Sequence, residues 1–257
     1  MNNAYTLVWS FRNRIDIFIE SIRSADATSP KEVNFCLVDG SSDENTITKL
    51  REFCNTIHDR TIRICESTYR TTCQEAWNLG IMLSDTSHVL FTSSDCILEK
   101  PGWVEAFDQT FAAGADYVIV ENHSLFGISR NLVATIGWFD EVFQRGPHVD
   151  VDYMIRATEL CKSIVVISND GYHTHFDDIE VTKKRLVSDV PDRLEMHTCT
   201  NENIFKQKWQ SSWPGWKDAI ASGATAMPHP PTHINTVKRI RDEINSHPLY
   251  TKRYNNA

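Results

Sequence analysis

The sequence predicts an α/β protein with a central, mostly parallel sheet flanked by helices. Short apolar runs recur along the first 120 residues, and stretches with helical spacing of apolar residues lie between most of them. This alternation is typical of βαβ units, in which strands covered on both faces are nearly continuous in apolar residues. The 257 residues are enough for one large domain, or for one domain with an appendage.

Each expected strand is an apolar run of strand length. In the first half of the chain these runs are residues 5–11, 33–38, 61–65, 89–91 and 117–120. Two further strand-like runs are closely spaced in the second half, at residues 164–167 and 171–175. The second half is otherwise less regular in its apolar pattern.

The expected helices show apolar residues three and four positions apart, which gives one buried stripe. They cover residues 15–22, 47–54 with Ser42 or Asp43 as the cap, 76–83, a stretch through residue 111 that starts after Pro101, and 149–160. A charged helix near residues 236–246 is expected to be part of a C-terminal helical extension.

Composition excludes several classes of protein. With 41% apolar and 23% charged residues the chain is typical of globular proteins. A net charge of −8 argues against a protein that depends on neutralising nucleic-acid phosphates. Seven cysteines without a CxxC pair favour free thiols in a reducing compartment. No apolar run approaches the ~20 residues of a membrane span, and the N-terminus does not read as a signal peptide, so we expect a cytoplasmic protein.

Candidate binding residues follow the expected strands, because ligands of parallel α/β sheets bind beyond the carboxyl ends of the strands. These residues are Ser10, Arg12, Asn13, Asp39, Ser93, Ser94 and Asp95. Asp39 could hold a nucleotide base, whereas Asp95 could meet a diphosphate only through a divalent cation, because two anions need a metal between them. Both acids also suit an ordinary turn or cap. The glycine-rich fingerprints of dinucleotide and P-loop sites are absent from the sequence.

Six segments in this order resemble the family 2-like glycosyltransferases of the GT-A fold, across roughly residues 4–176. They are YTLVWSFRNR, VNFCLVDGSSD, CQEAWNLGI, HVLFTSSDCILEKPGW, IGWFDEVF and VDVDYMIRA. The resemblance implies a GT-A domain over residues 1–200, with a nucleotide-sugar-binding half at 1–100 and an acceptor-binding half at 101–200. Residues 201–257 would form the helical extension.

The resemblance also implies a metal site and a catalytic base. Asp95 stands where a DxD-type motif ends, with Ser93 in place of the first acid, and would hold Mn²⁺ or Mg²⁺. The family has a metal-binding histidine at the end of a late strand, which matches His173 or His175 here. These two histidines are two positions apart on the expected strand, so both emerge on the same face, and His175 is preferred. The family has a Glu-Asp motif where this sequence has Val149-Asp150. Asp150 would therefore be the general base.

Further residues are expected around the sugar and the acceptor. Arg130, Trp138 and Asp140 would shape the donor-sugar or acceptor site, although Trp138 could equally be a core residue. Asp152 should point to a different helix face from Asp150, and Arg156 could be a surface cation or a diphosphate contact.

These features predict a glycosyltransferase that moves a sugar from a nucleoside-diphosphate sugar to a glycan or other hydroxyl acceptor, with inversion and metal assistance. One alternative is an inactive module that binds a nucleotide sugar or a glycan, because acids of the family pattern are replaced at Ser93 and Val149. The other is a metal-dependent hydrolase that uses His173 and His175.

Overall fold

The computed structural model describes residues 5–67, 70–120, 122–143, 149–160, 163–175, 203–205 and 251–254. The strands are β1 (Tyr5–Phe11), β2 (Asn34–Asp39), β3 (Ile62–Glu66), β4 (His88–Ser93), β5 (Cys96–Leu98), β6 (Tyr117–Val120), β7 (Asn122–Ser129), β8 (Ile164–Ile167), β9 (His173–His175) and β10 (Thr251–Tyr254). The helices are α1 (Ile15–Thr28), α2 (Glu44–Cys54), α3 (Cys73–Leu83), α4 (Trp103–Ala112), α5 (Arg130–Ile136) and α6 (Val149–Leu160).

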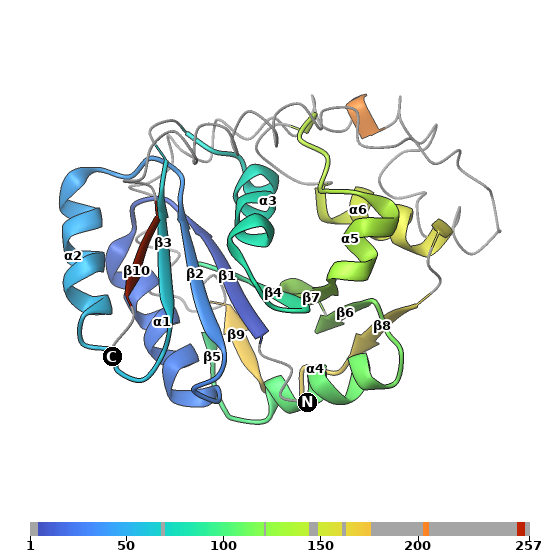
Figure 1. The fold of residues 1–257 in the computed structure, drawn as a ribbon, viewed down its shortest axis with the longest axis horizontal. Helices are drawn as coiled ribbons and strands as arrows, with labels where there is room; N and C mark the ends of the chain where they lie inside the picture. Colours follow the sequence, from blue (N-terminus) through green and yellow to red (C-terminus); the bar gives the residue numbers. More distant parts are fainter. Residues whose placement is uncertain are drawn as a thin grey trace.

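The main sheet is mixed, with the strand order β10-β3-β2-β1-β4-β7-β6-β8 (Figure 1). Strands β3, β2, β1 and β4 are parallel, and β6 is parallel to β8. Strand β7 lies antiparallel between β4 and β6, and β10 adds antiparallel to β3. A separate antiparallel pair is formed by β5 and β9. The arrangement is the GT-A fold that the resemblance implied.

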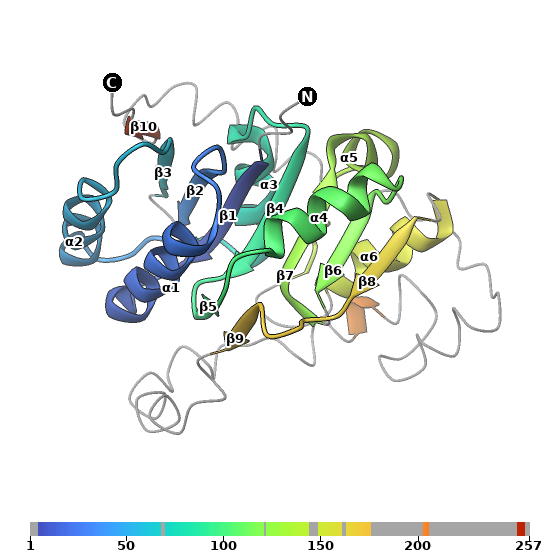
Figure 2. The same cartoon turned by 90° about the horizontal axis from the view of Figure 1, so that it is seen from below.

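Helices cover both faces of the sheet, as Figures 1 and 2 show. One core cluster combines the apolar faces of α1, α2 and α4 with alternate residues of the strands, such as Leu7 and Trp9 of β1. The other combines α3, α5 and α6 with the opposite strand face, which includes Val8. Because successive strand residues point to opposite faces, the continuous apolar runs supply both layers.

The expected helices and strands are present with boundaries that shift by a few residues at most, except that α1 continues to Thr28. Asp43 is the cap of α2, and its carboxylate accepts a hydrogen bond from the Thr46 backbone N–H at 2.8 Å. The sequence did not predict β5, β7, α5 or β10. The expected helix near residues 236–246 lies outside the described residues.

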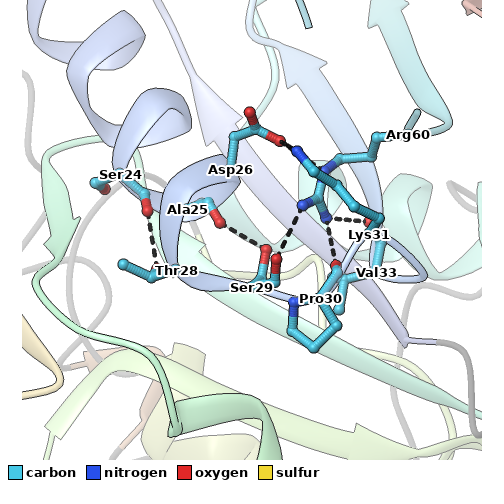
Figure 3. Close-up of polar contacts among 9 residues, drawn as sticks. All are labelled: Ser24, Ala25, Asp26, Thr28, Ser29, Pro30, Lys31, Val33 and Arg60. Atoms are coloured by element: carbon cyan, nitrogen blue, oxygen red, sulfur yellow. Dashed lines mark hydrogen bonds and ion pairs between the residues drawn. The ribbon is translucent and has the colours of Figure 1, made fainter. Parts of the chain in front are cut away.

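Buried Arg60 fastens the end of α1 to the start of β2 (Figure 3). Its guanidinium donates to the carbonyl oxygens of Ser29 at 3.2 Å, Pro30 at 3.0 Å and Val33 at 2.6 Å. Its Nε also donates to the Asp26 carboxylate at 3.0 Å. One side chain thus satisfies the carbonyl groups just after the C-terminal end of α1 and in the turn before β2. These bonds fix where β2 begins.

In the part of the chain that the structure describes, no helix is long and apolar enough to cross a membrane.

Candidate active site

The strand ends of β1, β2 and β4 lie at one level, at the same edge of the sheet. Within the sheet, Ser10 of β1 is in register with Ser93 of β4, and Phe11 is in register with Asp39 of β2. All three strands are parallel, so the residues that follow them leave the sheet at this edge. The structure therefore brings together the segments that carry Asn13, Asp39 and Asp95.

Two of these loops are joined by hydrogen bonds. The Asn13 backbone N–H donates to the Ser42 hydroxyl at 2.7 Å, and the Asn13 side-chain oxygen accepts from the Asp43 backbone N–H at 3.2 Å. The Arg12 Nε lies 3.5 Å from the Ser41 carbonyl oxygen. Asn13 and Ser41 have positive φ values of 52° and 70°, which non-glycine residues seldom adopt. Observed strain of this kind is typical of loops that hold a ligand, which supports a binding role for this edge.

Asp39 is buried at the base of these loops, with 2% of its surface exposed. Its two carboxylate oxygens accept from the Ser42 backbone N–H at 3.0 and 3.1 Å. Burial raises the pKa of Asp39 above its ordinary value, and the hydrogen bonds from Ser42 oppose that shift. A buried carboxyl beside a partly exposed loop can accept hydrogen bonds from the N–H groups of a ligand that binds in that loop.

Asp95 lies in the turn between β4 and β5, after the partly exposed Ser93 and Ser94. Its side chain is 15% exposed, and its Oδ2 lies 3.5 Å from the Nη1 of Arg14. Arg14 adopts a left-handed conformation, with φ of 50°, directly before α1. This edge thus presents a carboxylate and a cation together.

The late histidines differ in their distance from Asp95 along the β5 and β9 pair. His175 is in register with Cys96, which follows Asp95, whereas His173 is in register with Leu98 and is 5% exposed. The register thus pairs the backbone of His175 with the residue next to Asp95, and that of His173 with a residue two positions further on.

The described residues contain no group of three His, Cys, Asp or Glu side chains that could hold a metal. Asp95 with the neighbouring serine hydroxyls is a small oxygen donor set. Such a set fits Mg²⁺ or Mn²⁺ bound together with a diphosphate, because these cations keep several ligands from phosphate and water.

Asp150 reaches the same edge from α6. Thr92 of β4 is in register with Leu125 of the antiparallel β7, so His123, two residues before Leu125, lies beyond the end of β4. The Oδ2 of Asp150 is 3.4 Å from the Nδ1 of His123, and the two side chains are 28% and 19% exposed. The fully buried Asp152 faces the interior, as expected for a residue two positions along a helix.

The surroundings of Asp150 are mostly neutral. Burial lowers the pKa of His123, and the Asp150 charge opposes that shift. Burial and the Asp150 charge both raise the pKa of the Cys73 thiol and of the Tyr117 hydroxyl. At neutral pH these three neighbours are therefore uncharged.

The segment with Trp138 and Asp140 is held against α3. The Asn78 side chain donates to the Phe139 carbonyl at 3.0 Å and accepts from the Phe139 N–H at 3.0 Å, and Gln74 donates to the Phe143 carbonyl. Trp138 is partly buried and packs on the second core cluster. Asp140 is 1% exposed, and its carboxylate accepts from the Val142 N–H at 3.0 Å.

Arg130 is not at this edge, so the expectation that it shapes a sugar site is wrong. It follows the antiparallel β7, whose last residue, Ser129, is in register with His88 at the start of β4. Its guanidinium donates hydrogen bonds to three backbone carbonyls in the last turn of α3 and just after it, those of Ile81, Ser84 and Thr86.

Arg156 is neither a surface cation nor a diphosphate contact. It is 1% exposed, and its Nε is 3.1 Å from the Asp152 carboxylate. It also donates to the carbonyls of Ile136 and Trp138, both at 2.9 Å.

Two residues of this edge were missed. Arg14 follows Asn13 directly, so the strand-end rule that selected Arg12 and Asn13 could have found it. His123 belongs to a strand that the sequence pattern did not reveal, and no local signal marks it.

The strand order and the helices that cover the sheet define an α/β domain of the GT-A class. The chain belongs to glycosyltransferase family 2: the family model, Glycosyl transferase family 2, matches residues 6–149. A search of curated proteins finds no match.

Solved structures share the fold. S. aureus TarS superimposes with a TM-score of 0.56 at 14% identity, covering 66% of this chain and 36% of TarS. The complex of S. aureus TarS 1-349 with UDP-GlcNAc gives the same TM-score and identity, over 57% of that chain. Mannosyltransferase PcManGT from Pyrobaculum calidifontis, in complex with GDP-Man and Mn²⁺, has a TM-score of 0.56 at 13% identity, covering 95% of this chain and 75% of that one. The chain thus spans less than two thirds of the length of S. aureus TarS and of its 1-349 fragment.

Proposed function

We propose that this protein is a glycosyltransferase that moves a sugar from a nucleoside-diphosphate sugar to an acceptor hydroxyl, with inversion at the anomeric carbon. The proposal rests on one observation: three segments that are separate in the sequence, with Asp39, Asp95 and Asp150, lie at the same edge of the sheet. Membership of glycosyltransferase family 2 supports it.

The nucleotide would bind over β1 and β2. Asp39 would accept from the base, and the loop of Ser10, Arg12 and Asn13 would line the nucleoside, because these residues leave the sheet beside it. Arg14 would offset part of the diphosphate charge, since its guanidinium already faces the carboxylate of Asp95. The nucleotide would therefore bind across the two hydrogen-bonded loops.

The diphosphate would meet Asp95. This carboxylate, with the hydroxyls of Ser93 and Ser94 and with His175, would hold Mn²⁺ or Mg²⁺; His173 is the less favoured ligand because it lies two residues further from Asp95 in the strand register. When bound, such an ion stabilises the negative charge of a leaving diphosphate.

Asp150 would act as the general base. It takes the proton of the acceptor hydroxyl while the acceptor oxygen forms a bond to the anomeric carbon. The bond from that carbon to the diphosphate oxygen breaks, and its electron pair stays with the diphosphate. Attack from the face opposite the leaving group inverts the anomeric carbon. Trp138 would line the acceptor side, on a turn that the Asp140 carboxylate stabilises.

Membership of glycosyltransferase family 2 favours transfer over the hydrolase alternative. An inactive binding module stays an outcome of the experiment below.

The test is release of nucleoside diphosphate and transfer to a panel of glycan acceptors, with Mn²⁺. UDP-GlcNAc and GDP-Man are the first donors, because structural neighbours were solved with them. We expect Asp95→Asn and Asp150→Asn to abolish transfer. Glu20→Gln, which changes an exposed acid paired with Arg23, is the matched control. Wild-type protein that binds donors but never releases diphosphate would instead be a binding module.

A further inference from the structure

We propose that His123 is a positioning residue for Asp150: its Nδ1–H donates to Oδ2 of the carboxylate and leaves Oδ1 to take the acceptor proton. This inference rests on the proposed function and adds a residue to its mechanism. It starts from the 3.4 Å separation of His123 Nδ1 and Asp150 Oδ2.

The imidazole ring is held by aromatic neighbours. The Tyr117 ring lies at 6.1 Å between centroids with an interplanar angle of 61°, and the Phe126 ring lies at 5.7 Å with an angle of 66°. Such edge-on contacts restrict rotation of a side chain that is already 81% covered. The ring can therefore orient a partner, as a freely rotating surface histidine cannot.

The two ring nitrogens face different surroundings, and this selects one tautomer. Nδ1 faces the Asp150 carboxylate, while Nε2 is buried without a hydrogen-bond partner in the described structure. A proton on Nε2 would bury an unpaired donor and would set the Nδ1 lone pair against a carboxylate oxygen. A proton on Nδ1 avoids both costs and forms the bond to Asp150. The 3.4 Å distance is long for a hydrogen bond, as is common for catalytic contacts before substrate binds.

The other titratable groups around this pair do not compete for Asp150 at neutral pH. Cys73 of α3 and Tyr117 of β6 are kept neutral by burial, which raises the pKa of each. On α6 itself, Asp152 pairs with Arg156 in the interior. A hydrogen bond to the ionised carboxyl favours its charged form, so loss of the His123 donor should be visible in the pH profile of the reaction.

The kinetic test compares His123→Phe, which keeps a flat ring without a donor, with His123→Asn, whose side-chain amide can replace Nδ1–H. For His123→Phe we expect kcat to fall by roughly tenfold to a hundredfold, part of the 10²–10⁴ that a positioned base contributes. KM for the donor should be unchanged, and the acid limb of kcat/KM should move to higher pH. His123→Asn should recover most of kcat. Unchanged kcat and acid limb in a folded His123→Phe would overturn the proposal.

A second measurement does not depend on turnover. ¹⁵N NMR of the imidazole in the wild-type protein should show the Nδ1–H tautomer, and Asp150→Asn should change its Nδ1 shift. An Nε2–H tautomer would overturn the proposal even if transfer is observed. Absence of all transfer by the wild type would refute the proposed function, while the tautomer would still decide whether His123 bonds to Asp150.

Discussion

Asp150 and Asp152 are two residues apart, yet replacement of Asp152 by alanine should mainly lower stability and replacement of Asp150 should mainly abolish transfer. Asp152 is fully buried with its carboxylate 3.1 Å from the Nε of Arg156, which is 1% exposed. Asp152→Ala leaves the guanidinium in the interior without its counter-ion. Breaking a buried pair in this way costs about 3–5 kcal/mol. Because Arg156 keeps its hydrogen bonds to the Ile136 and Trp138 carbonyls, we expect the lower end of that range.

For Asp150→Ala the expected loss of stability is much smaller. Its side chain is 28% exposed and lies 3.4 Å from His123, whose pKa burial lowers. What it contributes is a negative charge in the first turn of α6, which is worth about 0.3–1 kcal/mol. Under the proposed function the same change removes the base and with it the transfer reaction.

Thermal and urea unfolding, each followed by circular dichroism, measure the first effect. At ~2 °C per kcal/mol for a chain of this size, Asp152→Ala should lower Tm by about 6 °C or more, and Asp150→Ala by about 2 °C or less. Transfer assayed well below both Tm values should be retained in Asp152→Ala and lost in Asp150→Ala. Equal stability of the two variants would refute the assignment of Asp152 to a buried ion pair.

Three further predictions follow from the same edge and core. Asp95→Asn should weaken Mn²⁺ binding in the presence of UDP or GDP by about tenfold or more, and Ser93→Asp should tighten it, as measured by calorimetry. Burial raises the pKa of Asp39 above its ordinary 3.8, so the folded state binds that proton more tightly than the unfolded state. The wild type should therefore lose stability relative to Asp39→Asn as pH rises from about 4, in urea unfolding at a series of pH values. Gly80→Ala would place a Cβ against the Val8 side chain, which should cost about 1–3 kcal/mol, and Val8→Ala in the same chain should recover part of it.

The sequence predicted the parallel part of the fold well because burial on both faces makes each strand a continuous apolar run. Strand β7 lacks that pattern: His123, Ser124 and Gly127 interrupt it, although it lies in the middle of the sheet. Gly127 is needed there, since a Cβ would come within 2.5 Å of the Leu90 side chain and within 3.0 Å of the Phe107 ring. Close packing of α4 thus selected a residue that weakens the local strand signal.

The direction of strand β7 also explains which of the predicted site residues lie at this edge of the sheet and which do not. The rule that ligands bind where strands end holds for parallel strands, and it correctly brought Asp39 and Asp95 to one edge. In an antiparallel strand the edges are exchanged, so Arg130, which follows β7, lies at the far edge. The start of β7 lies at the near edge, and there His123 meets Asp150. Strand direction, which depends on pairings between distant segments, therefore decides which residues around β7 can take part in the chemistry.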